Sequence, residues 1–241
     1  MLQNHRCEDI AQVAVRFQLY NLMRQYFHNS RLTEQKAEKF LVAGSPIAGD
    51  SQEMAEGICL LRHAWQHPES EAEYEYNMLF VGPGKLLAPP FESSYRNAER
   101  TLMQQETMAV RDFYTRLGLT CELLNSVPDD HIATELEFVC YLHAKAGGCI
   151  EKGLEGHACL FLELYREFFN AHLRHWIPAH CQDVLRQART SLCRGMALIM
   201  LGFFRQEEQR LELSKEGFPW IINGPTQDEH LLKGQQDQLR R

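Results

Sequence analysis

The sequence lacks the features that would place the protein in a membrane or on nucleic acid. No run of apolar residues among its 241 residues approaches the length that spans a bilayer, and the first nine residues lack the apolar core of a secretory signal. Lys and Arg number 25 against 32 Asp and Glu, and a net charge of −7 argues against a nucleic-acid binder. We therefore expect a cytoplasmic protein that does not insert into the membrane.

The signatures of common catalytic and cofactor sites are missing as well. The sequence has no P-loop, no three-glycine dinucleotide turn, no nucleophile elbow and no HExxH. Its eight cysteines include no CxxC pair, so we interpret them as reduced thiols that are mostly buried. The sequence thus predicts no cofactor and no catalytic residue, and favours a binding protein over an enzyme.

Alternation typical of strands is absent, and the apolar residues follow a helical period almost throughout. Stops are expected at Gly147–Gly148 and at Pro178, and a capping box is expected at Asp50 and Glu53. Helices are expected over residues 8–28, 33–42, 50–66, 69–80, 95–117, 129–146, 154–176 and 179–206. The predicted fold class is all-α, a compact single-domain helical bundle.

The composition changes after Gln206. Residues 207–241 are charged and rich in Gln, with one apolar island at 218–222. We predict a helical domain over residues 1–206 and a charged tail over 207–241. The apolar island is expected to dock on the helical body, either over a binding groove or simply to seal the core.

One motif joins an apolar helix end to a stiff loop. Tyr76, Leu79 and Phe80 lie at i, i+3 and i+4, which makes one apolar patch on a helix. Gly82-Pro83-Gly84 and Pro89-Pro90 then end the helix, and the two glycines allow positive φ or close backbone approach. This pattern predicts a groove for a peptide, with the alternative that the three apolar residues are ordinary core contacts.

A second motif, residues 128–131, begins another predicted helix. An aspartate after Pro128 is a good N-cap, because it accepts backbone N–H groups and interacts well with the helix dipole. His131 would then be a solvated residue of the first turn. In the functional interpretation Asp130 and His131 instead bind a peptide backbone or pair with an arginine. Both interpretations stay open on sequence alone.

The histidines suggest a rival function. His172 and His175 lie at i, i+3, and His180 follows just beyond Pro178, a spacing that can hold zinc. A helical metal-dependent hydrolase is therefore the alternative to a binding protein. His143, on the apolar side of its helix, is interpreted as a core histidine whose hydrogen bonds are satisfied.

Together the two motifs resemble those of the TorD/DmsD/NarJ family of chaperones, which bind the twin-arginine signal peptides of molybdenum-cofactor redox enzymes. The first motif matches at Tyr76, Leu79, Phe80, Gly82, Pro83, Pro89, Pro90 and Ser93, and the second at Pro128, Asp130, His131, Glu135, Leu136 and Phe138. The resemblance implies a TorD-like fold and a chaperone that holds the apo-enzyme until cofactor insertion and export. It also implies a monomer or a domain-swapped homodimer.

The resemblance also implies which residues bind the signal peptide, or leader. These are Tyr76, Leu79, Phe80, Pro90, Ser93, Asp130 and His131. The apolar part of the leader would be buried on the Tyr76 patch and on Leu87. Its two arginines would pair with Asp130, together with Glu92 or Glu135, because the guanidinium fork suits carboxylates. The remaining alternative is a helical interaction protein with some other partner.

Overall fold

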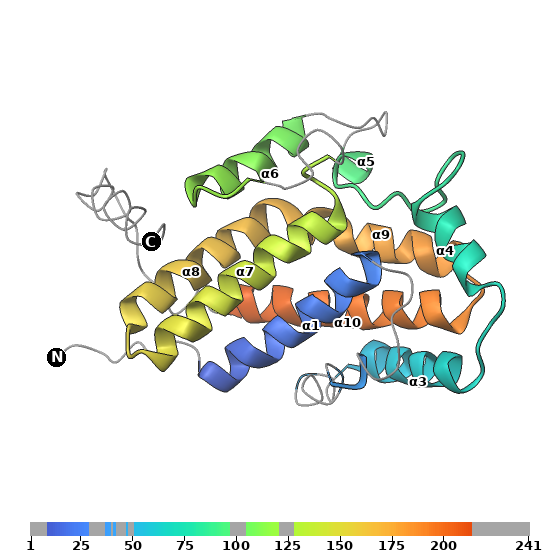
Figure 1. The fold of residues 1–241 in the computed structure, drawn as a ribbon, viewed down its shortest axis with the longest axis horizontal. Coiled ribbons are helices and arrows are strands. Elements are labelled where there is room, and N and C mark those ends of the chain that lie inside the picture. Colours follow the sequence, from blue (N-terminus) through green and yellow to red (C-terminus); the bar gives the residue numbers. More distant parts are fainter. Residues whose placement is uncertain are drawn as a thin grey trace.

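A computed structural model of the chain describes residues 9–28, 37–39, 41, 47, 51–96, 105–120 and 128–213. In this part of the chain the structure is helical and holds no strand, which confirms the predicted all-α class (Figure 1). No helix of the described part combines the length and the apolar character needed to cross a bilayer.

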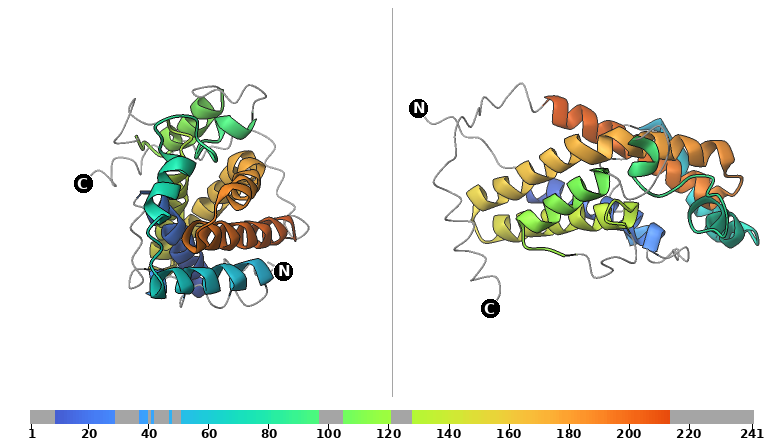
Figure 2. Two further views of the ribbon diagram at one scale, coloured as in Figure 1. Left: turned by 90° about the vertical axis from the view of Figure 1, so that its right-hand side faces the viewer. Right: turned by 90° about the horizontal axis from the view of Figure 1, so that it is seen from above.

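In chain order, the described elements are all helical. They are α1 (Ile10–His28), α3 (Gln52–Gln66), α4 (Ala72–Phe80), α5 (Ser93–Arg96), α6 (Gln105–Arg116), α7 (Ile132–Glu151), α8 (Glu155–Phe168), a π-helical turn η1 (Phe169–Leu173), α9 (Arg174–Gln187) and α10 (Ser191–Leu213). Helix α1 packs on α7, α7 packs on α8, and α10 packs on both α3 and α9. Figures 1 and 2 show α4 at one end of the molecule and the N-terminal end of α8, just after α7, at the other.

Helices α3 and α10 cross at glycines that allow their backbones to touch. A Cβ added at Gly57 would lie 2.6 Å from the carbonyl oxygen of Gly195, and one added at Gly195 would lie 2.9 Å from the carbonyl oxygen of Gly57. Real side chains do not tolerate such distances, so the absence of a Cβ at both positions sets the separation of the two helices.

Two carboxylates from the region of α4 cap the N-terminus of α10. Glu75 accepts the backbone N–H groups of Arg189 at 2.6 Å and of Thr190 at 3.0 Å. Glu69 accepts the N–H of Ser191 at 2.8 Å. Because acidic groups interact favourably with the positive end of a helix dipole, these bonds fix the start of α10 and attach α4 to it.

Two predicted helix ends are wrong. Helix α7 continues through Gly147 and Gly148 to Glu151, and it ends beside Gly153, whose φ is +70°. Glycine costs a helix interior about 1 kcal/mol, and the packing of α7 against α1 and α8 overrides that local signal.

Pro178 does not separate two helices either, because it lies inside α9. Trp176 and Ile177 before it and Cys181 and Val184 after it are buried, and this burial offsets the lost backbone hydrogen bond. The break comes instead at residues 188–190, where Glu75 takes up the backbone N–H groups.

Other predicted boundaries shift by a few residues. Ser51 rather than Asp50 is the N-cap of α3, since its hydroxyl accepts the N–H of Met54 at 3.2 Å. Helix α6 ends just before Gly118 (φ +67°), as expected. Most of the predicted helix 33–42, and residues 97–104 of the predicted helix 95–117, lie outside the described residues.

Helix α10 continues past Gln206 to Leu213. The first residues of the predicted tail are therefore helical. The apolar island at 218–222 lies outside the described residues, and the division into a domain and a tail stays a prediction.

Candidate functional site

The structure brings the two sequence motifs together. Phe91 and His131 form an isolated antiparallel bridge. The N–H of Ile132 donates to the carbonyl of Pro90 at 2.9 Å, and the N–H of Glu92 donates to the carbonyl of Asp130 at 3.0 Å. The loop that follows α4 is thereby joined to the start of α7.

Asp130 lies at the centre of this junction and is fully buried. One carboxylate oxygen accepts the backbone N–H of Ser93 at 2.9 Å, and the other accepts the hydroxyl of Thr107 at 2.9 Å. The side chain thus links the start of α7 to α5 and α6. A leader arginine would have to share Asp130 with these internal partners.

The helix cap at this junction differs from the expectation. Neither aspartate caps α7; its N-cap is His131, whose Nδ1 accepts the N–H of Ala133 at 3.1 Å. Asp129 instead accepts a bond from Arg111 at 2.6 Å. His131 is half-buried rather than solvated, and its ring packs edge-on against Phe91.

Tyr76, Leu79 and Phe80 face the core of the bundle. All three are buried, and the hydroxyl of Tyr76 donates to the backbone carbonyls of Tyr26 and Phe27. The three residues therefore make ordinary core contacts, which is one of the two alternatives that the sequence left open. Direct contact of these residues with a leader stays a prediction. The same holds for Pro90 and Ser93, which are also buried.

A narrow apolar pocket lies against Phe80 and leaves no room for a water molecule. It is lined by Tyr26, Phe27, His180, Cys181, Val184, Cys193, Met196, Ala197 and Met200. His180 closes one side, because its Nδ1 donates to the carbonyl of Pro89 at 3.2 Å and so holds the Pro-Pro segment against α9. A leader side chain could enter this pocket only if residues that line it moved apart.

The loop between the motifs folds back over the end of α4. Gly82 and Gly84 have φ values of +104° and +114°, which confirms the expected positive φ. The N–H of Leu87 then donates to the carbonyl of Met78 at 3.2 Å. This path leaves apolar side chains exposed, with Val81 at 64% and Leu87 at 41% exposure.

Tyr74 on the same side of α4 is also exposed, at 69%. Val81 follows it by seven residues, or two helical turns, so the two side chains share one face of α4. The carboxylates of Glu71 and Glu73 are exposed beside Tyr74. We call Tyr74, Val81 and Leu87 the outer apolar surface. Solvent reaches it, in contrast to the Tyr76 patch on the inner side of the helix.

Glu92 and Glu135 are both fully buried near the junction. Glu92 accepts bonds from Arg96 at 3.0 Å and from His172 at 2.7 Å. Glu135 accepts the indole N–H of Trp176 at 3.1 Å, and its other oxygen has no hydrogen-bond partner among the residues that the structure describes. Burial and the nearby charges of Glu92 and Asp130 raise the pKa of Glu135 well above its ordinary value. Glu135 is therefore not a solvated position on α7, although a glutamate on a helix is usually exposed.

The histidine cluster proposed for a metal does not form. His172 pairs with Glu92, His175 is exposed, and His180 bonds to Pro89. Within the residues that the structure describes, no three His, Cys, Asp or Glu side chains come together in a way that could hold a metal ion. The metal-dependent hydrolase therefore gains no support. The core position predicted for His143 is confirmed, and its Nδ1 donates to the carbonyl of Val139 at 2.9 Å. Its Nε2 has no hydrogen-bond partner among the described residues, so the expectation that all its hydrogen bonds are satisfied is wrong.

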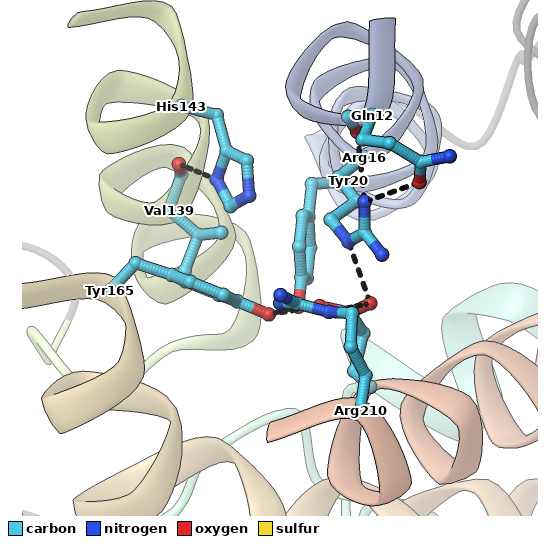
Figure 3. Close-up of polar contacts among 8 residues, drawn as sticks. Gln12, Arg16, Tyr20, Val139, His143, Tyr165 and Arg210 are labelled. Carbon is cyan, nitrogen blue, oxygen red and sulfur yellow. Dashed lines mark hydrogen bonds and ion pairs between the residues drawn. The ribbon is translucent and has the colours of Figure 1, made fainter. Parts of the chain in front are cut away.

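A second buried polar cluster joins α1, α8 and α10, and sequence reasoning missed it (Figure 3). Glu207 accepts bonds from Arg16 at 2.8 Å and from Arg210 at 2.7 Å, and the hydroxyl of Tyr165 donates to it. The hydroxyl of Tyr20 lies 2.8 Å from that of Tyr165. The i, i+3 spacing of Glu207 and Arg210 is only a weak sequence signal for a buried ion pair. The pairing of Glu207 with Arg16 has no signal in the sequence.

The core histidines predict a pH dependence of stability. Burial lowers the pKa of His143 and of His180 to about 4 each, so both are neutral in the fold at pH values where the unfolded chain binds protons. When the pKa of a histidine is lower in the folded than in the unfolded state, the free energy of unfolding of the protein decreases as the pH falls from about 6.5 towards 4. We expect His143→Leu to reduce the slope of unfolding free energy against pH in that window by roughly 1.4 kcal/mol per pH unit.

Urea unfolding at several pH values between 4.5 and 7.5 measures this slope. His175→Leu, at an exposed position, controls for the removal of a histidine as such. Equal slopes for the wild-type protein and His143→Leu would contradict the assignment of the core histidine.

The fold and the site define an all-helical protein in which two sequence motifs build one polar junction beside an exposed apolar surface. The comparisons with known proteins agree with the sequence motifs. The family model for the nitrate reductase delta subunit matches residues 47–182, more than half of the chain, and the chain belongs to this family. The expected membership is confirmed.

Curated relatives are chaperones by name and not enzymes. The chain is 30% identical over 83 residues to the probable Tat proofreading chaperone DmsD of Haemophilus influenzae, and the aligned part is 34% of this chain and 41% of the relative. It is 24% identical over 147 residues to the chaperone protein TorD of Vibrio cholerae, with 61% of this chain and 65% of the relative aligned. It is 29% identical over 137 residues to the Tat proofreading chaperone DmsD of Salmonella paratyphi A, with 56% of this chain and 65% of the relative aligned. The chain thus spans less than two thirds of each of these relatives.

Proposed function

We propose that this protein is a cytoplasmic chaperone that binds the twin-arginine leader of a molybdenum-cofactor oxidoreductase subunit and holds the subunit until cofactor insertion and export. The observation that carries the proposal is the junction of the two motifs, at which the loop after α4 is held on the start of α7. The names of the relatives, Tat proofreading chaperones and a TorD chaperone, support the same role.

The outer apolar surface and the junction offer a leader two kinds of contact. A twin-arginine leader carries two guanidinium groups followed by an apolar, helix-prone stretch. Its apolar stretch lies on Tyr74, Val81 and Leu87, where solvent-exposed area is available for burial. The buried motif residues Tyr76, Leu79 and Phe80 hold the loop and helix that carry this surface. The exposed Glu71 and Glu73 give its edge a negative charge that suits a cationic peptide.

A double variant at the outer apolar surface tests this proposal. We expect Val81→Ser with Leu87→Ser to weaken leader binding at least tenfold, because each apolar side chain that is buried on binding contributes on the order of 1 kcal/mol. Both side chains are exposed in the free protein, so the melting temperature should change little. Calorimetric titration with a synthetic leader, beside thermal melts, separates the two effects.

Leu160→Ser is the matched control. Leu160 is 55% exposed and belongs to the first half of α8. The N-terminal end of that helix lies at the opposite end of the molecule from α4 (Figures 1 and 2). The substitution Leu160→Ser removes a similar apolar side chain and should leave the affinity for the leader unchanged. If the double variant binds the leader as tightly as the wild-type protein does, the outer apolar surface is not the contact.

A further inference from the structure

Arg96 occupies a binding site for a guanidinium group at the junction. One of its terminal nitrogens donates to Glu92 at 3.0 Å and to the backbone carbonyl of Ala171 at 2.9 Å. The two acceptors come from different parts of the chain, α5 with its preceding turn and the π-helical turn η1. A carboxylate and a carbonyl therefore converge on one guanidinium.

Glu92 is held in place from its other side. Its second oxygen is 2.7 Å from Nδ1 of His172, which is itself buried. The Glu92 side chain is 0% exposed, whereas that of Arg96 is 33% exposed. Arg96 is thus the partner of Glu92 that solvent reaches, and it covers a carboxylate whose position is already fixed.

We infer that Glu92 and the carbonyl of Ala171 form an arginine-binding site that Arg96 fills in the free protein, and that an arginine of a bound peptide takes its place. This inference rests on the proposed function, since the peptide is the twin-arginine leader. Arg96 acts as an internal competitor: every leader arginine that enters must first displace it. The affinity of the free protein is lowered by the free energy of that displacement.

The burial of Glu92 favours arginine over lysine at this site. One terminal nitrogen of the guanidinium serves both acceptors, so the preference does not come from its fork geometry. A guanidinium is more weakly hydrated than an ammonium group, and it therefore loses less hydration when it pairs with a fully buried carboxylate. The occupant seen in the structure is a guanidinium. The site therefore selects a leader by the chemistry of its arginines as well as by its charge.

The competing explanation is that Arg96 only neutralises a buried carboxylate. In that case its removal costs stability and brings no specific gain in binding. A general gain from the lost positive charge would be the same for any cationic peptide. The two explanations differ in how they treat leaders with arginine and with lysine.

The test compares wild-type protein, Arg96→Ala and the milder Arg96→Gln by calorimetric titration. The probes are a synthetic leader with its Arg-Arg pair and the same leader with Lys-Lys. We expect both variants to bind the Arg-Arg leader about tenfold tighter than the wild-type protein does, with little change for the Lys-Lys leader. Arg116→Ala is the control, because it removes one positive charge from an exposed pair with Glu167.

A second measurement needs no leader. Millimolar arginine ethyl ester should raise the melting temperature of Arg96→Ala more than lysine ethyl ester does, and should not do so for the wild-type protein. If the wild-type protein binds the leader while neither variant gains affinity, or if both leaders gain equally, the inference is overturned. If no protein binds either leader, the proposed function fails, and the absence of any arginine-specific rise in melting temperature then overturns the site as well.

Discussion

Replacing Glu207 by alanine is expected to lower the free energy of unfolding by roughly 3–5 kcal/mol. Glu207 is 1% exposed and binds both Arg16 and Arg210. Arg16 is itself buried, so the variant leaves a guanidinium inside the protein without its carboxylate. Burying an unpaired charge is far more costly than losing a pair at the surface.

The same variant should change the response to acid. Burial by itself raises the pKa of Glu207, but the Arg210 and Arg16 guanidiniums and the hydrogen bonds to the carboxylate bring it down to about 2. This is below the ordinary value of a glutamate. The contribution of Glu207 to stability is therefore present above about pH 4.5 and is lost as the pH falls from there towards 2. In Glu207→Ala the free energy of unfolding should therefore fall less between about pH 4.5 and pH 2 than it does in the wild-type protein.

Urea unfolding at pH 7 and at acid pH measures both effects. Glu167→Ala is the matched control, because its pair with Arg116 is about half exposed on both sides, and it should cost no more than about 1 kcal/mol. A loss for Glu207→Ala no larger than that of the control would show that the buried cluster does not hold α1 against α10.

Gly57→Ala is expected to destabilise the protein by about 1–3 kcal/mol, although alanine favours a helix over glycine by about 1 kcal/mol. The new Cβ would lie 2.6 Å from the carbonyl oxygen of Gly195 and 2.8 Å from a side-chain carbon of Ile199. The first of these is backbone and cannot rotate away, so α3 and α10 would have to separate. Gly195→Ala should act in the same way, since its Cβ meets the backbone of α3.

Gly148→Ala supplies the control with the opposite sign. Gly148 lies inside α7, and a Cβ there meets nothing within 4 Å. The substitution should therefore stabilise the protein by about 0.5–1 kcal/mol through helix propensity alone. Thermal or urea unfolding of Gly57→Ala, Gly195→Ala and Gly148→Ala measures the sign of each change in stability. If Gly57→Ala were stabilising like Gly148→Ala, the close crossing of the two helices would be wrong.

The sequence predicted those parts of the fold and site in which local chemistry and tertiary packing agree. The end of α4 is an example, because the apolar face stops where Gly82 and Pro83 begin, and the loop needs positive φ at both of its glycines. The resemblance assigned the two motifs to one binding site, and the structure joins them at Phe91 and His131, whereas their contact with a leader stays a prediction.

Other features could not be predicted because they depend on partners far away in the chain. The stop expected at Gly147–Gly148 fails because helices α1 and α8 pack along α7 and support it. Arg16 and Glu207 are 191 residues apart, and nothing near either residue indicates the other. For the candidate site, spacing placed Tyr76, Leu79 and Phe80 on one face of a helix. It did not show whether that face is turned to the core or to solvent.

The caps at the start of α10 have a consequence for how the protein would respond to a partner. Glu69 and Glu75 hold the backbone of residues 189–191, and the same short stretch of chain carries the outer apolar surface at Tyr74 and Val81. Any shift of α4 has to release hydrogen bonds at the first turn of α10. Helix α10 extends from there to the cluster around Glu207. When a partner binds at α4, the rate of hydrogen exchange at the amides of residues 189–191 should change. This measurement would report binding at α4 from a different segment of the chain.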